Sequence, residues 1–188
     1  VRHAYPGVEM HRTMVLLKDA DFEKPLLIDV FRVRSESASQ YDLPTWFQGH
    51  LLEQNFELQT ELTALKPLGS ANGYQHLWQE ASGKTKDRAA QFTWFTEGRF
   101  ITQTALVEPE DELIFARLGA NDPNFNLRRD PVFIQRKKSA QNALFASAIE
   151  AHGNYSPVEE IPENPYPHVA GLELLLDSPD YTALRIKH

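Results

Sequence analysis

Cysteine is absent from this chain of 188 residues, and acidic residues outnumber basic ones. Without cysteine there is no disulfide framework, no thiolate nucleophile and no thiolate metal ligand. The formal net charge of -7 argues against general nucleic-acid binding, which needs a concentrated basic field to displace counterions. Apolar runs are far shorter than the roughly 20 residues of a membrane-spanning helix. We therefore expect a soluble chain, and its start at Val1 without a signal segment predicts a piece of a longer protein.

Short segments of alternating apolar and polar residues follow one another along the chain, separated by turn residues. The segment Leu26–Arg34 is partly apolar on both faces, which predicts a central strand. Pro44 cannot donate to a ladder, so Gln40–Phe47 is expected at an edge or a bulge. Glu97-Gly98 is typical of a tight hairpin turn. The pattern predicts an all-β fold, an antiparallel β-sandwich or stacked sheets of about twelve strands, in a single domain covering residues 1–188.

Several connections are also predicted. Ser35–Ser39 is expected to be a loop, because it lacks apolar residues apart from one alanine. Tyr74–Ala81 and Ala89–Phe95 are expected to pair with each other across a short connection. Ser156–His168 contains four prolines, which predicts an absence of regular structure.

The polar segment Gly119–Pro131 separates two strand-like apolar runs and contains one glycine, two prolines, three asparagines and two aspartates. These residues favour loops, and a loop of about a dozen residues in a compact domain is usually functional or disordered. Its basic pair, Arg128 and Arg129, could bind a carboxylate through two parallel hydrogen bonds. An internal salt bridge to Asp122 or Asp130 is the alternative.

Aromatic side chains could form a platform on which sugar rings stack, although such residues more often belong to the core. Trp46 is the best candidate, because Pro44, two residues before it, predicts an irregular edge. The aromatic residues considered are Tyr41, Trp46, Phe47, Tyr74, Trp78 and Trp94.

Metal-site and catalytic patterns are weak. The seven histidines include no His-x-His pair, so a site from His11 with Asp29 or His50 has little support. No nucleophile elbow, phosphate loop or dinucleotide fingerprint occurs. We therefore predict no catalytic residue and no metal ligand in this chain. The carboxylates considered for acid/base work, each with turn chemistry as the alternative, are Asp29, Asp42, Glu110 and Asp111.

Five motifs together resemble the C-terminal part of the oligoalginate lyases of polysaccharide lyase family 17, within the heparinase II/III-like group. The likeness runs from about Met10 to the end of the chain. The motifs are Gln40–Pro44, Ala116–Pro123, Asn126–Pro131, Phe145–Ser147 and Glu150–Gly153.

This resemblance implies an N-terminal α/α toroid followed by a β-sheet domain, in a bacterial enzyme of the periplasm or cytoplasm. Such enzymes release unsaturated uronate from alginate oligosaccharides by β-elimination. A basic group removes the C5 proton while a tyrosine protonates the leaving oxygen. In the family these groups lie mainly on the toroid, and a His-x-His metal motif lies near the start of the β domain. None of these motifs occurs here, so the resemblance implies that the metal site lies upstream, with no cofactor in this chain.

The resemblance thus implies a non-catalytic C-terminal portion that buttresses the toroid, its partner, and is inactive alone. Trp46, Arg128 and Arg129 are the substrate-facing candidates. A carbohydrate-binding module for acidic polysaccharide is the alternative, and a homo-oligomerisation domain is a third possibility.

Overall fold

Antiparallel strands are the main element of the chain, which a computed structural model describes for residues 5–61, 63–119, 129–178 and 180–188. The described residues form thirteen strands and one turn of 3-10 helix, η1 (Tyr74–His76), which confirms the all-β prediction. The strands are β1 (Val8–Leu17), β2 (Leu26–Trp46), β3 (His50–Gln54), β4 (Glu57–Thr60), β5 (Lys66–Pro67), β6 (Leu77–Lys84), β7 (Ala89–Thr96), β8 (Arg99–Leu106), β9 (Glu112–Leu118), β10 (Pro131–Ser156), β11 (Ile161–Glu163), β12 (Gly171–Asp177) and β13 (Thr182–Lys187).

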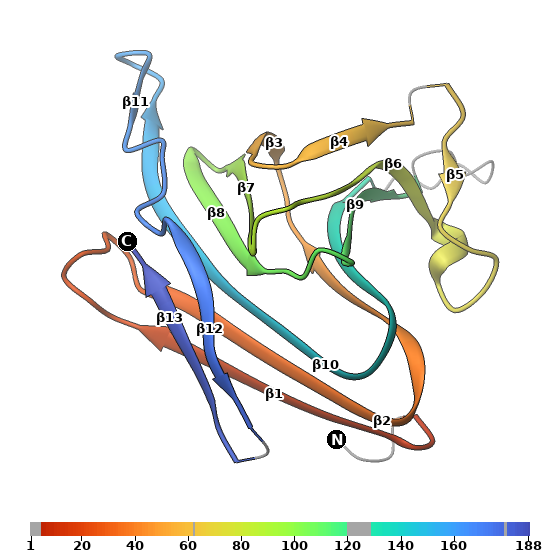
Figure 1. Cartoon of the computed structure of the whole chain (residues 1–188). Coiled ribbons are helices and arrows are strands. Elements are labelled where there is room, and N and C mark those ends of the chain that lie inside the picture. Colours follow the sequence, from red (N-terminus) through yellow and green to blue (C-terminus); the bar gives the residue numbers. More distant parts are fainter. Residues whose placement is uncertain (1–4, 62, 120–128, 179) are drawn as a thin grey trace.

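Two long strands, β2 and β10, run side by side through the molecule (Figure 1). They pair antiparallel along both their halves, with a register shift between Lys137 and Asn142 of β10. The predicted loop Ser35–Ser39 is wrong, because β2 continues through these residues. Side chains hold the irregular section together: Gln141 Nε2 donates to the carbonyl of Glu36 at 2.8 Å. A polar segment can therefore remain a strand when its neighbour supplies hydrogen bonds.

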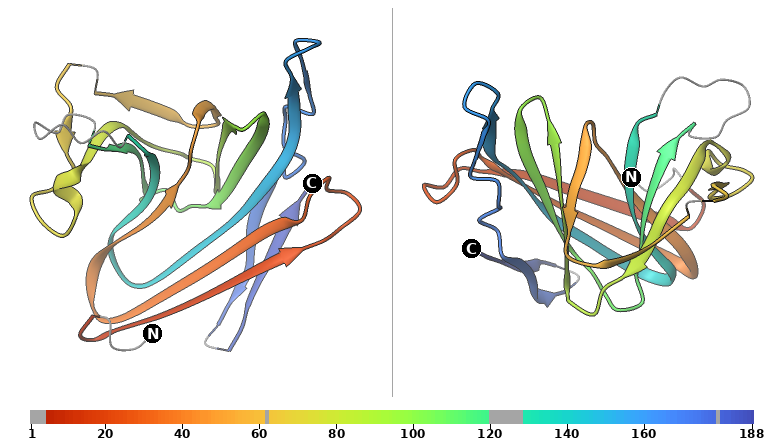
Figure 2. Two further views of the ribbon diagram at one scale, coloured as in Figure 1. Left: turned by 180° about the vertical axis from the view of Figure 1, so that it is seen from behind. Right: turned by 90° about the horizontal axis from the view of Figure 1, so that it is seen from above.

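The other edge of β10 changes partner along its length. Its N-terminal half pairs with β9 and its C-terminal half with β8. The main sheet accordingly follows the order β3-β7-β8-β10-β9-β6-β4. Its two end strands, β3 and β4, are consecutive in the chain, so the sheet curls back until its ends meet at Asn55 and Phe56 (Figures 1 and 2). Two half-sheets thus face each other across the enclosed space. One contains β3, β7, β8 and the C-terminal half of β10, and the other contains β4, β6, β9 and the N-terminal half of β10.

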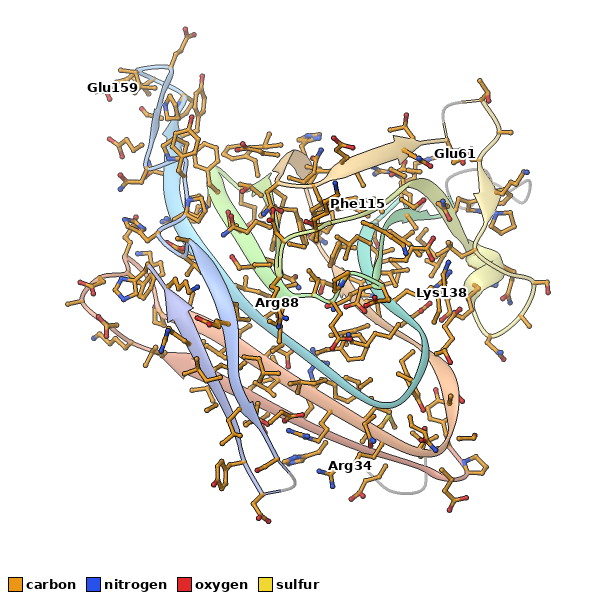
Figure 3. All side chains as sticks on the ribbon, viewed as in Figure 1. Arg34, Glu61, Arg88, Phe115, Lys138 and Glu159 are labelled. Carbon is orange, nitrogen blue, oxygen red and sulfur yellow. The ribbon has the colours of Figure 1, made fainter. Side chains whose placement is uncertain are left out.

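An aromatic cluster fills this space (Figure 3). The Phe92 ring of β7 lies 4.6 Å from the Phe133 ring of β10 and 5.5 Å from the Phe115 ring of β9. The predicted pairing of Tyr74–Ala81 with Ala89–Phe95 is therefore wrong. Strands β6 and β7 belong to opposite half-sheets and bond to β9 and β8. The consecutive strands β6 and β7 face each other through side chains, because β6 takes its hydrogen bonds from β4 and β9, whereas β7 takes its own from β3 and β8.

Local signals for turns and edges were more accurate. Pro44 lies opposite Ile134, in the part of β2 that pairs only with β10 among the described strands, as expected for an edge. Glu97 and Gly98 have φ of 50° and 78°, which confirms the tight turn between β7 and β8. The proline-rich segment is not wholly irregular, since β11 pairs briefly with the end of β10.

A second sheet, β12 with β13, packs against the main sheet through Leu172, which contacts Leu106 and Ala146. Arg32 of β2 ties this hairpin down, because its guanidinium donates to the Asp177 carboxylate and the Thr182 hydroxyl. In the described part of the chain, no helix has the length and hydropathy needed to cross a membrane.

Candidate ligand groove

A groove of about 870 Å³ lies where the end of β2, the start of β10 and the η1 segment meet. Alternation along β2 brings Asp42, Pro44 and Trp46 to one face of the strand, and all three line the groove. Tyr74 and His76 of η1 also line it. The groove therefore combines an apolar strip, an indole ring and several hydrogen-bonding groups.

Apolar packing beneath the groove explains its position. Ile114, Ala116, Val132 and Ile134 are buried together where β9 and β10 pair. Leu77, at the start of β6, packs against this cluster from the η1 side. The burial of these side chains holds the η1 segment beside the sheet, and the groove is the space that remains between them.

Asp42, Arg136 and Tyr74 form a hydrogen-bonded network at one side of the groove. Arg136 donates to both carboxylate oxygens of Asp42, from Nε at 2.9 Å and from a terminal nitrogen at 2.8 Å. The Tyr74 hydroxyl donates to Asp42 Oδ2 at 2.6 Å. The Arg136 guanidinium carbon also lies 5.9 Å from the centre of the Tyr74 ring. The Asp42 side chain is only 6% exposed, so this bidentate ion pair is largely shielded from water.

The environment of Tyr74 suppresses its ionisation. Burial of the phenol raises the pKa of Tyr74 most, and the hydrogen bond to Asp42 and the charge of that carboxylate add to it, to a value of about 12. Arg136 counteracts the increase only in part. The phenol is therefore neutral at ordinary pH, and its proton is engaged by Asp42. This arrangement orders the wall of the groove and does not supply a proton readily.

The Tyr74 phenol is expected to ionise later than an ordinary tyrosine when the folded chain is titrated with base. Folding raises the pKa of Tyr74 from 10.0 to about 12. The phenol's contribution to folding stability is therefore complete below pH 10 and is lost as the pH rises towards 12. Ultraviolet absorbance of tyrosinate measures this component. Tyr74→Phe should remove a late component, and denaturant should merge that component with the others. Loss of an early component in the variant would contradict the assignment.

The predicted substrate-facing residues lie in different surroundings. Trp46 lines the groove and is 48% exposed, whereas Phe47 and Trp94 are buried in the core. Arg129 is exposed and directly precedes Asp130, which lines the groove. Its carbonyl accepts a hydrogen bond from Arg117 at 2.9 Å. Arg128 lies outside the described residues, so its suggested roles remain predictions.

Most of the carboxylates that the sequence singled out are occupied by cations. Asp29 accepts two hydrogen bonds from Arg12, Asp42 two from Arg136, and Asp111 bonds Lys137. Alternation along β1 and β2 also directs His11 and Asp29 to opposite faces. Within the residues that the structure describes, no three or more histidine, aspartate or glutamate side chains are grouped so that they could hold a metal ion.

The fold and the groove define a class: a large antiparallel β module with an open groove that presents an exposed indole beside hydrogen-bonding groups. No family model matches the chain. Comparison with curated proteins is more specific. The chain is 36% identical over 174 residues to an exo-oligoalginate lyase of Saccharophagus degradans, a match covering 91% of this chain and 24% of the relative. It is 38% identical over 160 residues to an alginate lyase of Stenotrophomonas maltophilia, covering 85% of this chain and 22% of the relative.

The likeness to oligoalginate lyases that the sequence motifs carry is thereby confirmed, and the heparinase II/III-like grouping stays a prediction. The chain is related to alginate lyases over most of its own length, and it spans about a quarter of the length of these relatives.

Proposed function

We propose that this chain is the C-terminal β-sheet portion of a longer lyase that cleaves alginate oligosaccharides by β-elimination. One observation carries the proposal: the matched region fills 91% of this chain but 24% of the exo-oligoalginate lyase. A match of this kind is expected when one part of a larger enzyme is compared with the whole. Its partner would be the α/α toroid of the same protein, which would hold the main catalytic groups and any metal.

Within such an enzyme the β portion would brace the toroid and form one wall of the substrate cleft. Trp46 is suited to contact an apolar sugar face, because its indole is half exposed beside the groove. Tyr74 is poorly suited to act as the catalytic acid. Its pKa is raised to about 12, and its hydroxyl already donates to Asp42. These features support placing the proton transfers on the other part of the enzyme.

The test compares the chain with the longer protein that contains it, using alginate oligosaccharides as substrate. β-Elimination creates a conjugated double bond, which ultraviolet absorbance follows directly. We expect product from the longer protein and none from the chain alone. Turnover by the chain alone would overturn the non-catalytic role, and inactivity of the longer protein towards alginate would overturn the lyase assignment.

A carbohydrate-binding role is the second candidate, favoured by the exposure of Trp46 beside the groove. Titration of oligoalginate against tryptophan fluorescence distinguishes the two. A binding module should give a saturable change that Trp46→Ala abolishes, whereas a purely structural portion should give none.

A further inference from the structure

The outer edge of β1 is unusual for a natural β protein. Among the described strands, β1 pairs only with β2, through ten consecutive residue pairs without a register shift. Within the described residues, no strand pairs with the other edge of β1 between Met14 and Leu17, so the backbone groups of this part are open to another strand. Such edges are normally protected by charges, prolines or bulges, because they otherwise recruit foreign strands.

The C-terminal part of β1 lacks these protections. Met14, Val15, Leu16 and Leu17 are consecutive, uncharged and 57%, 46%, 72% and 38% exposed. Alternation directs Met14 and Leu16 to one face of the sheet and Val15 and Leu17 to the other. The strand is thus apolar on both faces, which is typical of a strand that has neighbours on each side and layers above and below.

This part of β1 is also firmly attached to the sheet. Arg12, just before it, donates to both oxygens of the buried Asp29 carboxylate, at 2.8 and 2.6 Å. The pairing with β2 continues to Leu17, which lies opposite the fully buried Leu26. The exposed side chains therefore belong to an ordered strand and not to a frayed end.

We propose that the outer edge of β1 between Met14 and Leu17 is covered in the longer protein by a β-strand from outside this chain, apolar on both faces, which extends the main sheet. This inference rests on the proposed function, because it takes the chain to be one part of a larger lyase. The relatives offer ample length for such a strand, since about three quarters of the exo-oligoalginate lyase lies outside the match. The edge of β1 is then part of the interface between the two parts of the enzyme.

A second copy of the chain would meet repulsion in one of its possible registers on this edge. Antiparallel pairing of two identical edges about a two-fold axis requires that facing residues lie on the same side of the sheet. The register centred on Val15 meets this condition and brings Met14 opposite Leu16, but it also brings Arg12 opposite Lys18 of the other copy. Like charges directly opposite each other destabilise a strand pair. This register of a second copy is therefore disfavoured by charge, and the light-scattering measurement below tests the registers centred on Met14 and Leu16, which avoid the Arg12–Lys18 contact.

Hydrogen exchange tests the proposal in the longer protein and in the chain alone. Amides of β1 in the longer protein should exchange more slowly by a factor on the order of 100, because opening costs little at a free edge and much more within a sheet. Leu16→Lys should restore fast exchange in the longer protein. Leu175→Lys, at a 49% exposed position on β12, is the matched control and should not. Circular dichroism of the Leu16→Lys chain checks that the fold survives.

Equal exchange of β1 in the chain and the longer protein would overturn the proposal. Light scattering of the chain gives a second overturning outcome, a dimer that Leu16→Lys converts to a monomer, because the occupant would then be a second copy. The lyase assay on the same longer protein separates the two ideas. Slow exchange of β1 in a longer protein without lyase activity would reject the lyase assignment and support the covered edge. Lyase activity without slow exchange of β1 would support the lyase assignment and reject the covered edge.

Discussion

Phe92→Ala is expected to lower the free energy of unfolding by about 3–5 kcal/mol, the usual range for removing a buried phenylalanine. Phe92 is 1% exposed and lies at the centre of the aromatic cluster. Its ring is 4.6 Å from Phe133, 5.4 Å from Trp94 and 5.7 Å from Phe47. Truncation therefore leaves a cavity between the two half-sheets. The half-sheets cannot easily move together to fill it, because the strands of one continuous hydrogen-bonded sheet hold them apart.

Urea unfolding followed by tryptophan fluorescence and circular dichroism measures this loss. Tyr181→Ala is the control, because Tyr181 is 64% exposed just before β13 and its truncation should change stability by less than about 0.5 kcal/mol. A cost for Phe92→Ala close to that of the control would show that the half-sheets do not depend on the cluster.

The second large effect concerns the buried ion pair between Lys137 of β10 and Asp111. Lys137 Nζ lies 2.9 Å from both carboxylate oxygens of Asp111, and their side chains are only 8% and 3% exposed. Asp111 Oδ2 also accepts from Gln135 Nε2 at 2.7 Å and from the Glu108 amide at 3.1 Å. Asp111→Ala leaves the lysine charge without its buried partner, so we expect a loss of about 3–5 kcal/mol.

A double-mutant cycle separates the pair from its surroundings. Lys137→Met combined with Asp111→Ala should recover a substantial part of the loss, because no uncompensated charge remains in the core. Glu108→Gln is the control. Glu108 also contacts Lys137 at 2.9 Å but is 70% exposed, so its change should cost at most about 1 kcal/mol. Additive losses in the double variant would contradict the coupling.

Local patterns in the sequence located several strands and turns, but not the full length of β2, which continues through the predicted loop Ser35–Ser39. The alternation of β7, the turn at Glu97-Gly98 and the edge position of Pro44 depend on neighbouring residues, and all three agree with the structure. Which strands pair is a different matter. β6 and β7 are adjacent in sequence, yet they lie in opposite half-sheets and meet through the core, because β6 bonds to β9 and β4 while β7 bonds to β8 and β3. The side chains of a strand do not by themselves specify which neighbouring strand it pairs with.

The groove shows the same division. The sequence singled out Trp46 through its neighbour Pro44, and the structure places the indole beside the groove. It also named Asp42 and Tyr74, but separately. These two residues are 32 positions apart, and Arg136 is 94 positions from Asp42, so only folding brings them together.

The sequence by itself determined the strand-rich class, the turn at Glu97-Gly98 and the likeness to alginate lyases, since these follow from short patterns and motifs. Only the tertiary structure decided the curled sheet, the network beside the groove and the uncovered edge of β1. These features arise from contacts between distant residues, whose geometry is set by how the half-sheets pack and not by any local pattern.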